Sequence, residues 1–423
     1  MGGSARQPGA PDAGAARGAL CQAGPVPRFE PFVGLRYDPA IPLDLVIAPP
    51  YDVVDPAERA ILAARHPDNA IHLELPEADP GSGLDRYQWA ARLWADWRRR
   101  RVLRPDPAPA FYAYRMTGTD GRSTTGVLGA LGLGRPGSAE GPDDVLPHEE
   151  TLPKPRSDRL DLLVATRANL SPIWGLSMAG GLTAALPVDG PAGARATDDD
   201  GVRHELWVVD DPAVERRVGA LVASAPVVIA DGHHRYQTAL SFKSGRPGDG
   251  PAGAVLALVV ELSAEQLAVG AIHRTLGGLP PGVDLEAELS ASFVVTAAGP
   301  ADPARAAELA AAGSLVLFDA RGTWVLEPRP GLAQAAGSDL DSALVGQALA
   351  PLGAQVDHRH SVAEATAPVV AGQAQAAFLL RPVRADQIAD WAAQRRRMPP
   401  KTTYFWPKPR TGMVFRSLDP GVS

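Results

Sequence analysis

The sequence has a single cysteine, Cys21, among its 423 residues. No intrachain disulfide can form, which favours a reducing, cytoplasmic setting. The longest apolar run, AGAVLALVV, ends at Glu261 and is far shorter than the roughly 20 residues that span a bilayer. The first twenty residues also lack the continuous apolar segment of a secretory signal. We therefore expect a soluble, cytoplasmic protein that does not cross a membrane.

The sequence also lacks an excess of basic residues. Lys and Arg number 41 against 48 Asp and Glu, a formal net charge of −7. Non-specific binding to DNA or RNA depends on a basic footprint. The charge therefore argues against nucleic acid as a partner, but it leaves room for a local phosphate site.

Four common catalytic signatures are absent as well. The sequence contains no GxxxxGK[ST] loop, no GxGxxG that leads from a strand into a helix, no HExxH and no GxSxG. The usual NTPase, Rossmann, zincin and α/β-hydrolase interpretations therefore lose support.

Composition and pattern divide the chain into four parts. Residues 1–24 are a low-complexity stretch that predicts a disordered tail. Residues 25–280 alternate strand and helix patterns and carry most of the polar motifs, so we expect a catalytic or ligand-binding α/β region there. Residues 281–397 predict a supporting α+β region with few catalytic residue types. Residues 398–423 predict an extended segment that packs back on the core.

Turn and cap signals predict several local structures. Leu45 to Ile47 are strand-like before two prolines. Asp55 and Asp211, each followed by proline, predict helix N-termini. The pair Asp120-Gly121 predicts a hairpin between two strands.

The stretch ADGHHRYQTAL is the first candidate site. The apolar run PVVIA predicts a strand that ends at Asp231 and leads into a helix. Gly232 allows a positive φ, and a helix start can hold an anion. Arg235 can bind phosphate, and Asp231 can hold Mg²⁺ or accept a proton. His233 and His234 project about 100° apart on a helix, which argues against a shared metal. The alternative is a surface turn with a capping aspartate.

The stretch HEETLPKPRSDRL is the second candidate. His148, Glu149 and Glu150 lie close in sequence to Lys154 and Arg159. Groups of both signs suit phosphate binding beside a carboxylate base. The alternative is a solvated loop that pairs its own charges before a helix.

Further polar residues occur late in the chain. Arg274 follows another apolar stretch, and His358 and His360 would share one face of a strand. A metal site there lacks a third and fourth ligand. Lys401 and Lys408 bracket an aromatic strand that either closes over a phosphate site or only docks on the core.

Four stretches in this order resemble one family. APPYDVV, HEETLPKPRSDRLDLLVATRANLSPIWG, ADGHHRYQTAL and MPPKTTYFWPKP are similar to the bacterial and archaeal DUF1015 family, a domain of unknown function, over about residues 26–418. The DGHHR stretch also resembles the phosphate-binding turn of the ParB/sulfiredoxin-like fold. That fold includes nucleotide-dependent free serine kinases.

The resemblance implies a mixed α/β (α+β) fold with a ParB/sulfiredoxin-like core and a second supporting region. The residues and the resemblance together predict a catalytic set: Glu149, Glu150, Asp231 and His233. They predict a phosphate- or nucleotide-binding set: Gly232, His234, Arg235, His148, Lys154, Arg159 and Lys401. The expected cofactors are ATP or ADP with Mg²⁺, the metal being held by Asp231.

These patterns lead to one preferred function and two alternatives. The preferred function is phosphoryl transfer on a small hydroxylated metabolite, with serine or phosphoserine as the expected substrate, in the kinase or the phosphatase direction. The first alternative is a nucleotide- or effector-binding regulatory protein without turnover. The second is a metal-dependent hydrolase that uses His148, His233 and His234.

Overall fold

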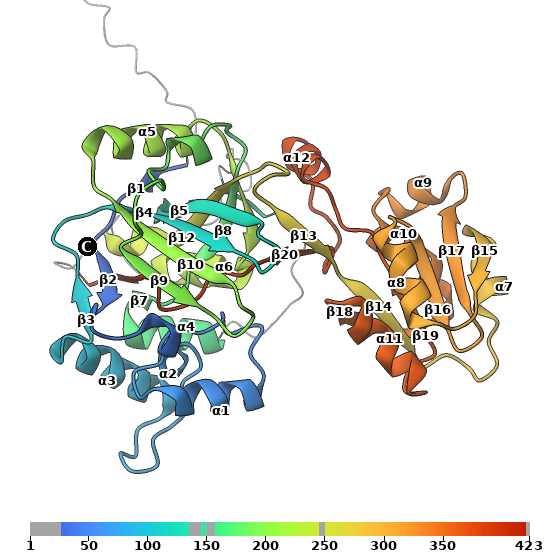
Figure 1. Cartoon of the computed structure of the whole chain (residues 1–423), viewed down its shortest axis with the longest axis horizontal. Helices are drawn as coiled ribbons and strands as arrows, with labels where there is room; N and C mark the ends of the chain where they lie inside the picture. The colour runs from blue at the N-terminus through green and yellow to red at the C-terminus, as the bar shows by residue number, and fades with distance from the viewer. Residues whose placement is uncertain (1–26, 135–144, 148, 150–156, 245–249, 420–423) are drawn as a thin grey trace, which may run out of the picture.

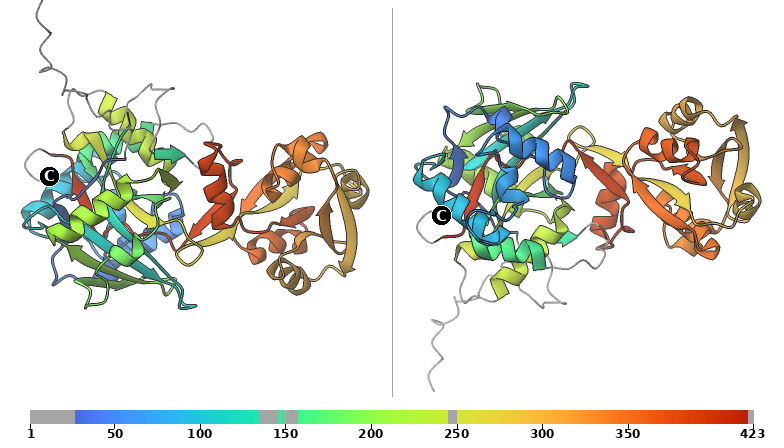
Figure 2. Two further views of the ribbon diagram at one scale, coloured as in Figure 1. Left: turned by 90° about the horizontal axis from the view of Figure 1, so that it is seen from above. Right: turned by 90° about the horizontal axis from the view of Figure 1, so that it is seen from below.

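The computed structural model describes residues 27–134, 145–147, 149, 157–244 and 250–419. It shows two bodies of helices and strands, one beside the other along the long axis (Figures 1 and 2). The predicted mixed α/β fold class is confirmed. The predicted tail lies outside the described residues, and the predicted division into four parts stays a prediction. None of the helices in the described ranges has the length and apolar character needed to cross a membrane.

The larger body is built on a nine-stranded sheet, as far as the chain is described. Its order is β6-β11-β8-β12-β5-β4-β10-β9, with β1 paired to β5. The strands are β1 (Phe29–Glu30), β4 (Phe111–Thr117), β5 (Ser123–Gly132), β6 (Val145–Pro147), β8 (Ile173–Ser177), β9 (Ala194–Thr197), β10 (Arg203–Val209), β11 (Val227–Asp231) and β12 (Ala254–Glu261). Pairing is antiparallel except for β12 with β8 and β11 with β6.

Two of the predicted local structures, a turn and a helix cap, lie within this body. Asp120-Gly121 lies in the turn between β4 and β5, as predicted. The run AVLALVVE of β12 is buried along nearly its whole length, because both faces of the sheet are covered by apolar cores. Helix α6 (His233–Ser244) packs against β8 and β12, and α5 (Pro212–Ala223) against β1. Asp211 caps α5 through the backbone N–H groups of Ala213 and Val214, as predicted.

A helical layer and a small sheet complete the larger body. The helices are α1 (Pro56–Arg65), α2 (Ile71–Glu74), α3 (Arg86–Arg99) and α4 (Ser157–Thr166), and the sheet of order β3-β2-β21-β7 comprises β2 (Gly34–Tyr37), β3 (Leu103–Pro105), β7 (Ala168–Asn169) and β21 (Phe415–Ser417). Asp55 caps α1 as predicted. The strand predicted over Leu45–Ile47 is wrong: Leu43–Leu45 form a 3₁₀ turn, and only Ala48 makes a bridge, to Thr411.

The smaller body is built on a six-stranded sheet in the described residues, of order β15-β17-β16-β19-β14-β18. The strands are β14 (His273–Gly277), β15 (Phe293–Gly299), β16 (Leu315–Asp319), β17 (Thr323–Pro328), β18 (Gln355–Arg359) and β19 (Ala376–Leu379). The helices are α7 (Leu285–Leu289), α8 (Pro303–Ala311), α9 (Leu332–Ala336), α10 (Asp341–Leu349) and α11 (Val362–Val370). Between the two bodies lie α12 (Ala385–Ala393) and the ribbon of β13 (Ala268–Ala271) and β20 (Thr403–Trp406) (Figure 1).

The first prediction concerns the helical layer, where Trp97 of α3 is fully buried against Tyr37. We expect Trp97→Ala to destabilise the larger body by about 3–5 kcal/mol, because a large apolar side chain is lost and a cavity remains. Urea unfolding followed by circular dichroism measures the change. Ile61→Ala on the exposed face of α1 is the control, for which we expect a change within about 0.5 kcal/mol. Equal effects of the two substitutions would contradict this packing.

Candidate functional site

The joint between β11 and α6 places the DGHHR stretch. A β-bulge between Ile229 and Asp231 shifts the register of β11 against β8, and Asp231, the last residue of the strand, pairs with Trp174. Gly232 has a φ of +86°, and a Cβ there would lie 3.1 Å from the Cα of Ile173. Both facts require glycine. The helix predicted after this turn is confirmed and begins at His233, so the side chain of Asp231 lies at a strand end and a helix start.

Asp231 holds two cations, one on each carboxylate oxygen. Lys408 Nζ lies 3.0 Å from Oδ1, and the Arg235 guanidinium donates to Oδ2 at 2.8 Å. Burial alone would raise the pKa of Asp231, but the charges of Lys408 and Arg235 outweigh it and lower the pKa to about 2. The same carboxylate raises the pKa of Lys408 despite its burial. All three groups are therefore charged at neutral pH.

Segments far apart in the sequence meet around this triad. Lys408 also lies 3.6 Å from Oδ2 of Asp52, which belongs to the APPYDVV stretch. The neighbouring Tyr51 is covered by the guanidinium of Arg159 from α4, 4.4 Å from the ring centroid. The structure thus brings Asp231 and Arg235 together with Arg159, and adds Lys408 from the C-terminal segment.

A small cavity lies beside Arg235. It has a volume of about 60 Å³ and is lined by the polar residues Glu74, Arg159, Asn169, Ser171, Arg235 and Thr238 and by apolar residues. Glu74 is almost fully buried and accepts a hydrogen bond from Ser171 Oγ at 3.0 Å. Arg159 donates to the backbone carbonyl of Glu74 at 2.7 Å. Sequence reasoning missed Glu74, because a glutamate at the end of a short helix carries no signal of burial.

Glu149 lies at a second place, against the C-terminal segment. Its carboxylate accepts hydrogen bonds from the backbone N–H groups of Lys401 and Thr402, the latter at 3.2 Å. Arg274 of β14 donates to the carbonyl of Lys401 at 2.8 Å. Glu149 and Lys401, predicted as base and phosphate ligand, are therefore neighbours. The other predicted residues of that stretch, His148, Glu150 and Lys154, lie outside the described residues.

Tyr404 of β20 connects the two places. Lys408 Nζ lies 5.8 Å from the centroid of the Tyr404 ring, and the ring of His360 lies 4.4 Å from it. The C-terminal segment from Lys401 to Lys408 therefore runs past both sets of polar residues.

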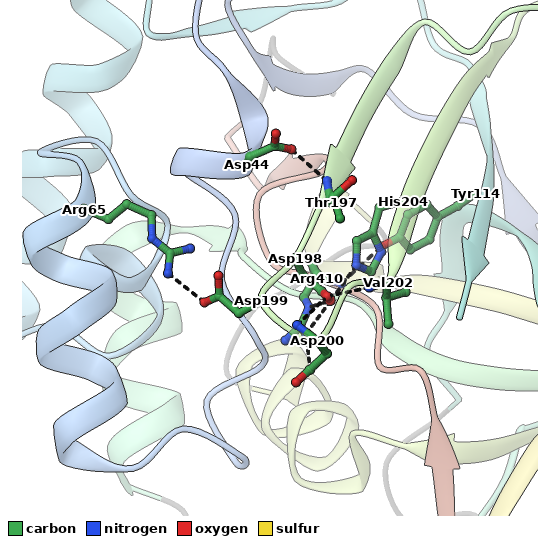
Figure 3. Close-up of polar contacts among 10 residues, drawn as sticks. All are labelled: Asp44, Arg65, Tyr114, Thr197, Asp198, Asp199, Asp200, Val202, His204 and Arg410. Carbon is green, nitrogen blue, oxygen red and sulfur yellow. Dashed lines mark hydrogen bonds and ion pairs between the residues drawn. The ribbon is translucent and has the colours of Figure 1, made fainter. Parts of the chain in front are cut away.

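A buried network fixes this segment just beyond Lys408. Arg410 donates through Nε to Oδ2 of Asp198 at 2.7 Å, and its backbone N–H donates to the hydroxyl of Tyr114 at 3.2 Å. Tyr114 lies 2.7 Å from Nδ1 of His204, whose Nε2 lies 2.9 Å from the same oxygen of Asp198. Figure 3 shows these four side chains around the loop before β10. Nothing in the sequence linked these residues, because they come from three distant segments.

The hydrogen bonds of this network suit a neutral His204. The Asp198 carboxylate can only accept, so Nε2–H of His204 donates to it. In the neutral ring Nδ1 then accepts from the hydroxyl of Tyr114. Burial lowers the pKa of His204, against the opposing effect of Asp198. A second proton on His204 would reverse the bond to Tyr114 and leave the hydroxyl hydrogen of Tyr114 without this acceptor, which weakens the anchor of Lys408.

This network predicts a pH effect on stability. The folded pKa of His204 lies below its ordinary value of 6.5, so below that pH the unfolded chain binds a proton that the folded chain lacks. We expect unfolding free energy to fall by about 1 kcal/mol more in the wild type than in His204→Gln between about pH 7.5 and about pH 5.5. Urea titrations at both pH values measure it. A loss of the same size in both proteins would rule out this role of His204.

The described residues offer no clear metal site. No group of three His, Cys, Asp or Glu side chains among them could hold a metal ion. His233 and His234 lie in the first turn of α6. Asp231, predicted to hold Mg²⁺, already binds a cation on each oxygen, and a third positive charge there would be repelled. The observed arrangement of Asp231 therefore does not fit the metal.

Comparisons with known proteins give one family and several distant structures. No curated protein matches the sequence. Among solved structures, a conserved hypothetical protein from Pyrococcus furiosus shares 14% identity, with 65% of this chain and 93% of that chain covered and a TM-score of 0.35. A free serine kinase in complex with AMP shares 14% identity, with 62% and 84% covered and a TM-score of 0.35. SbnI from Staphylococcus aureus, C-terminally truncated, shares 12% identity, with 68% and 86% covered and a TM-score of 0.36.

Likenesses at this level carry no argument about activity. A family model is more informative: the model described as "Protein of unknown function (DUF1015)" matches residues 29–343, most of the chain. The resemblance inferred from the four sequence stretches is therefore confirmed. The chain belongs to the DUF1015 family.

Proposed function

We propose that the protein is a phosphoryl-transfer enzyme acting on a small hydroxylated metabolite, with serine or phosphoserine as the preferred candidates. The observation that carries the proposal is the triad of Asp231, Arg235 and Lys408 at a strand end and helix start. Phosphoryl transfer depends mainly on positioning and on neutralising the charge of the phosphoryl oxygens. Two largely buried cations fixed by one carboxylate supply both.

The proposal gives each residue a role. Lys408 and Arg235 hold phosphoryl oxygens, and Arg159, which lines the cavity beside Arg235, is a further cation for the ligand. With a pKa of about 2, Asp231 is a weak proton acceptor. We therefore assign Asp231 to positioning the two cations and keep Glu149 as the candidate base, with Glu150 beside it in sequence.

The phosphate donor in this proposal is ATP or ADP. The resemblance of DGHHR to the phosphate-binding turn of free serine kinases supports it, and the start of α6 suits an anion because helix N-termini favour negative charge. His233 and His234 in its first turn are kept as further contacts of the nucleotide. Mg²⁺ would neutralise phosphate oxygens when bound with the nucleotide, but no step here is assigned to it.

The first functional prediction concerns turnover. Purified protein incubated with ATP or ADP, Mg²⁺ and serine should form phosphoserine, or release phosphate from phosphoserine alone. We expect Arg235→Ala to lower the rate by roughly 10²-fold, because a charge contact to the transferring group is lost. Chromatography of nucleotides and phosphoserine measures it, with Arg235→Lys as a variant that keeps the charge.

Arg305→Ala is the matched control, because Arg305 lies on α8 of the smaller body and pairs only with Glu308 at the surface among the ion pairs of the described chain. It should leave the rate unchanged. Absence of turnover above the level of Asp231→Asn would refute the proposal.

A regulatory protein that binds a nucleotide or another effector without turnover is the second candidate. One observation favours it: Asp231, Arg235, Lys408 and Glu149 are all engaged in internal contacts, as in a site held ready for a ligand. Calorimetry separates the two functions, since binding of ADP without product formation supports the regulatory function. No observation in the described residues favours the metal-dependent hydrolase.

A further inference from the structure

A second set of cationic groups lies on one face of the smaller body, at its junction with the larger one. Strands β14 and β18 are antiparallel, and Arg274 is directly opposite His358. Directly opposed residues of an antiparallel pair point to the same face, with Cβ atoms about 5 Å apart. His360 lies one residue beyond the end of β18, and its charge acts on His358. Three groups that can carry positive charge are thus side by side.

Arg274 is a buried cation, and no carboxylate of the described residues forms an ion pair with it. Arg274 is only 6% exposed, and its guanidinium donates to the backbone carbonyls of Ile272 and Lys401 at 2.7 and 2.8 Å. Burial lowers the pKa of Arg274 only to about 10, so it stays charged at neutral pH. Glu149, whose charge acts on it, is bonded to backbone N–H groups of the C-terminal segment.

The C-terminal segment adds more positive charge to this face. Lys401 is exposed, and its charge acts on both His358 and His360. Tyr404 contacts the ring of His360, and Lys408 Nζ lies over the ring of Tyr404. A buried, unpaired cation is costly, and an anion bound beside it relieves that cost. The charge is therefore arranged for an anionic ligand rather than for packing alone.

We propose that Arg274, His358, His360 and Lys401 form an anion subsite that binds a phosphate group at the junction of the two bodies. The subsite extends the proposed function, because it adds residues of the smaller body to the ligand site. Its role in turnover rests on that function. Its binding of an anion stands independently of turnover.

Proton uptake distinguishes this subsite from an ordinary basic patch. The charges of Arg274, Lys401, Asp357 and His360 act on His358, and those of Glu364, Lys401, Lys408 and Asp52 act on His360. Partial burial and then the neighbouring cations lower the pKa of His358, and burial with Lys401 lowers that of His360 despite Glu364. A bound anion opposes these effects and raises both pKa values. Binding therefore takes up protons and tightens as pH falls.

Sulfate is the most suitable probe for the test, because it keeps both negative charges across the relevant pH range, so any pH dependence of binding comes from the protein. We expect calorimetry on the full chain to show sulfate binding roughly tenfold tighter at about pH 6 than at about pH 8. The double variant His358→Gln/His360→Gln should lose that pH dependence. Arg359→Gln, on the same strand but at the alternate position, is the matched control and should keep it.

Competition then identifies the source of the phosphate group. ADP, phosphoserine and inorganic phosphate are each titrated in competition with sulfate. The natural ligand of the subsite is the compound that displaces sulfate and whose binding depends on pH in the wild type but not in the double variant. Sulfate affinity that is equal at both pH values, or unchanged in the double variant, would overturn the subsite. If the pH effect appears but no turnover is seen, the subsite stands and the proposed function fails.

Discussion

The ion pair between Asp231 and Lys408 is the contact on which the candidate site depends. It joins the strand end of β11 to a residue 177 positions later in the chain. Removing one partner of such a largely buried pair takes a close opposite charge from the other and therefore destabilises the site. Arg235 shares the same carboxylate, so its orientation depends on the pair as well. The turn at Gly232 is what places Asp231 where Lys408 can reach it.

The C-terminal segment, called the strap below, contacts both bodies. β20 pairs with β13 between the bodies, Arg410 is held by Asp198 and Tyr114, and β21 pairs with β2 and β7 in the small sheet of the larger body. Lys401 and Lys408 are carried on this strap to the two sets of polar residues. A change in the strap therefore affects both sets, and this is the physical basis for treating them as parts of one ligand site.

Local structure was predictable where a few neighbouring residues determine it. Asp55, Asp211 and the pair Asp120-Gly121 form the predicted caps and turn, because each aspartate side chain accepts from a backbone N–H group two or three residues later. The prediction failed at Leu45–Ile47, where the backbone N–H groups of Val46 and Ile47 bond to Leu43 instead of a strand. The network of His204 and the burial of Glu74 arise only from tertiary packing, so no local pattern could reveal them.

The affinity for ADP in a double-mutant cycle tests the central claim most directly. Asp231→Asn, Lys408→Met and the double variant are compared with the wild type by calorimetry. If the pair builds the phosphate site, ADP binds the wild type and the two substitutions are coupled by about 1 kcal/mol or more. Strictly additive effects, or ADP affinity that none of the substitutions changes, would contradict the account.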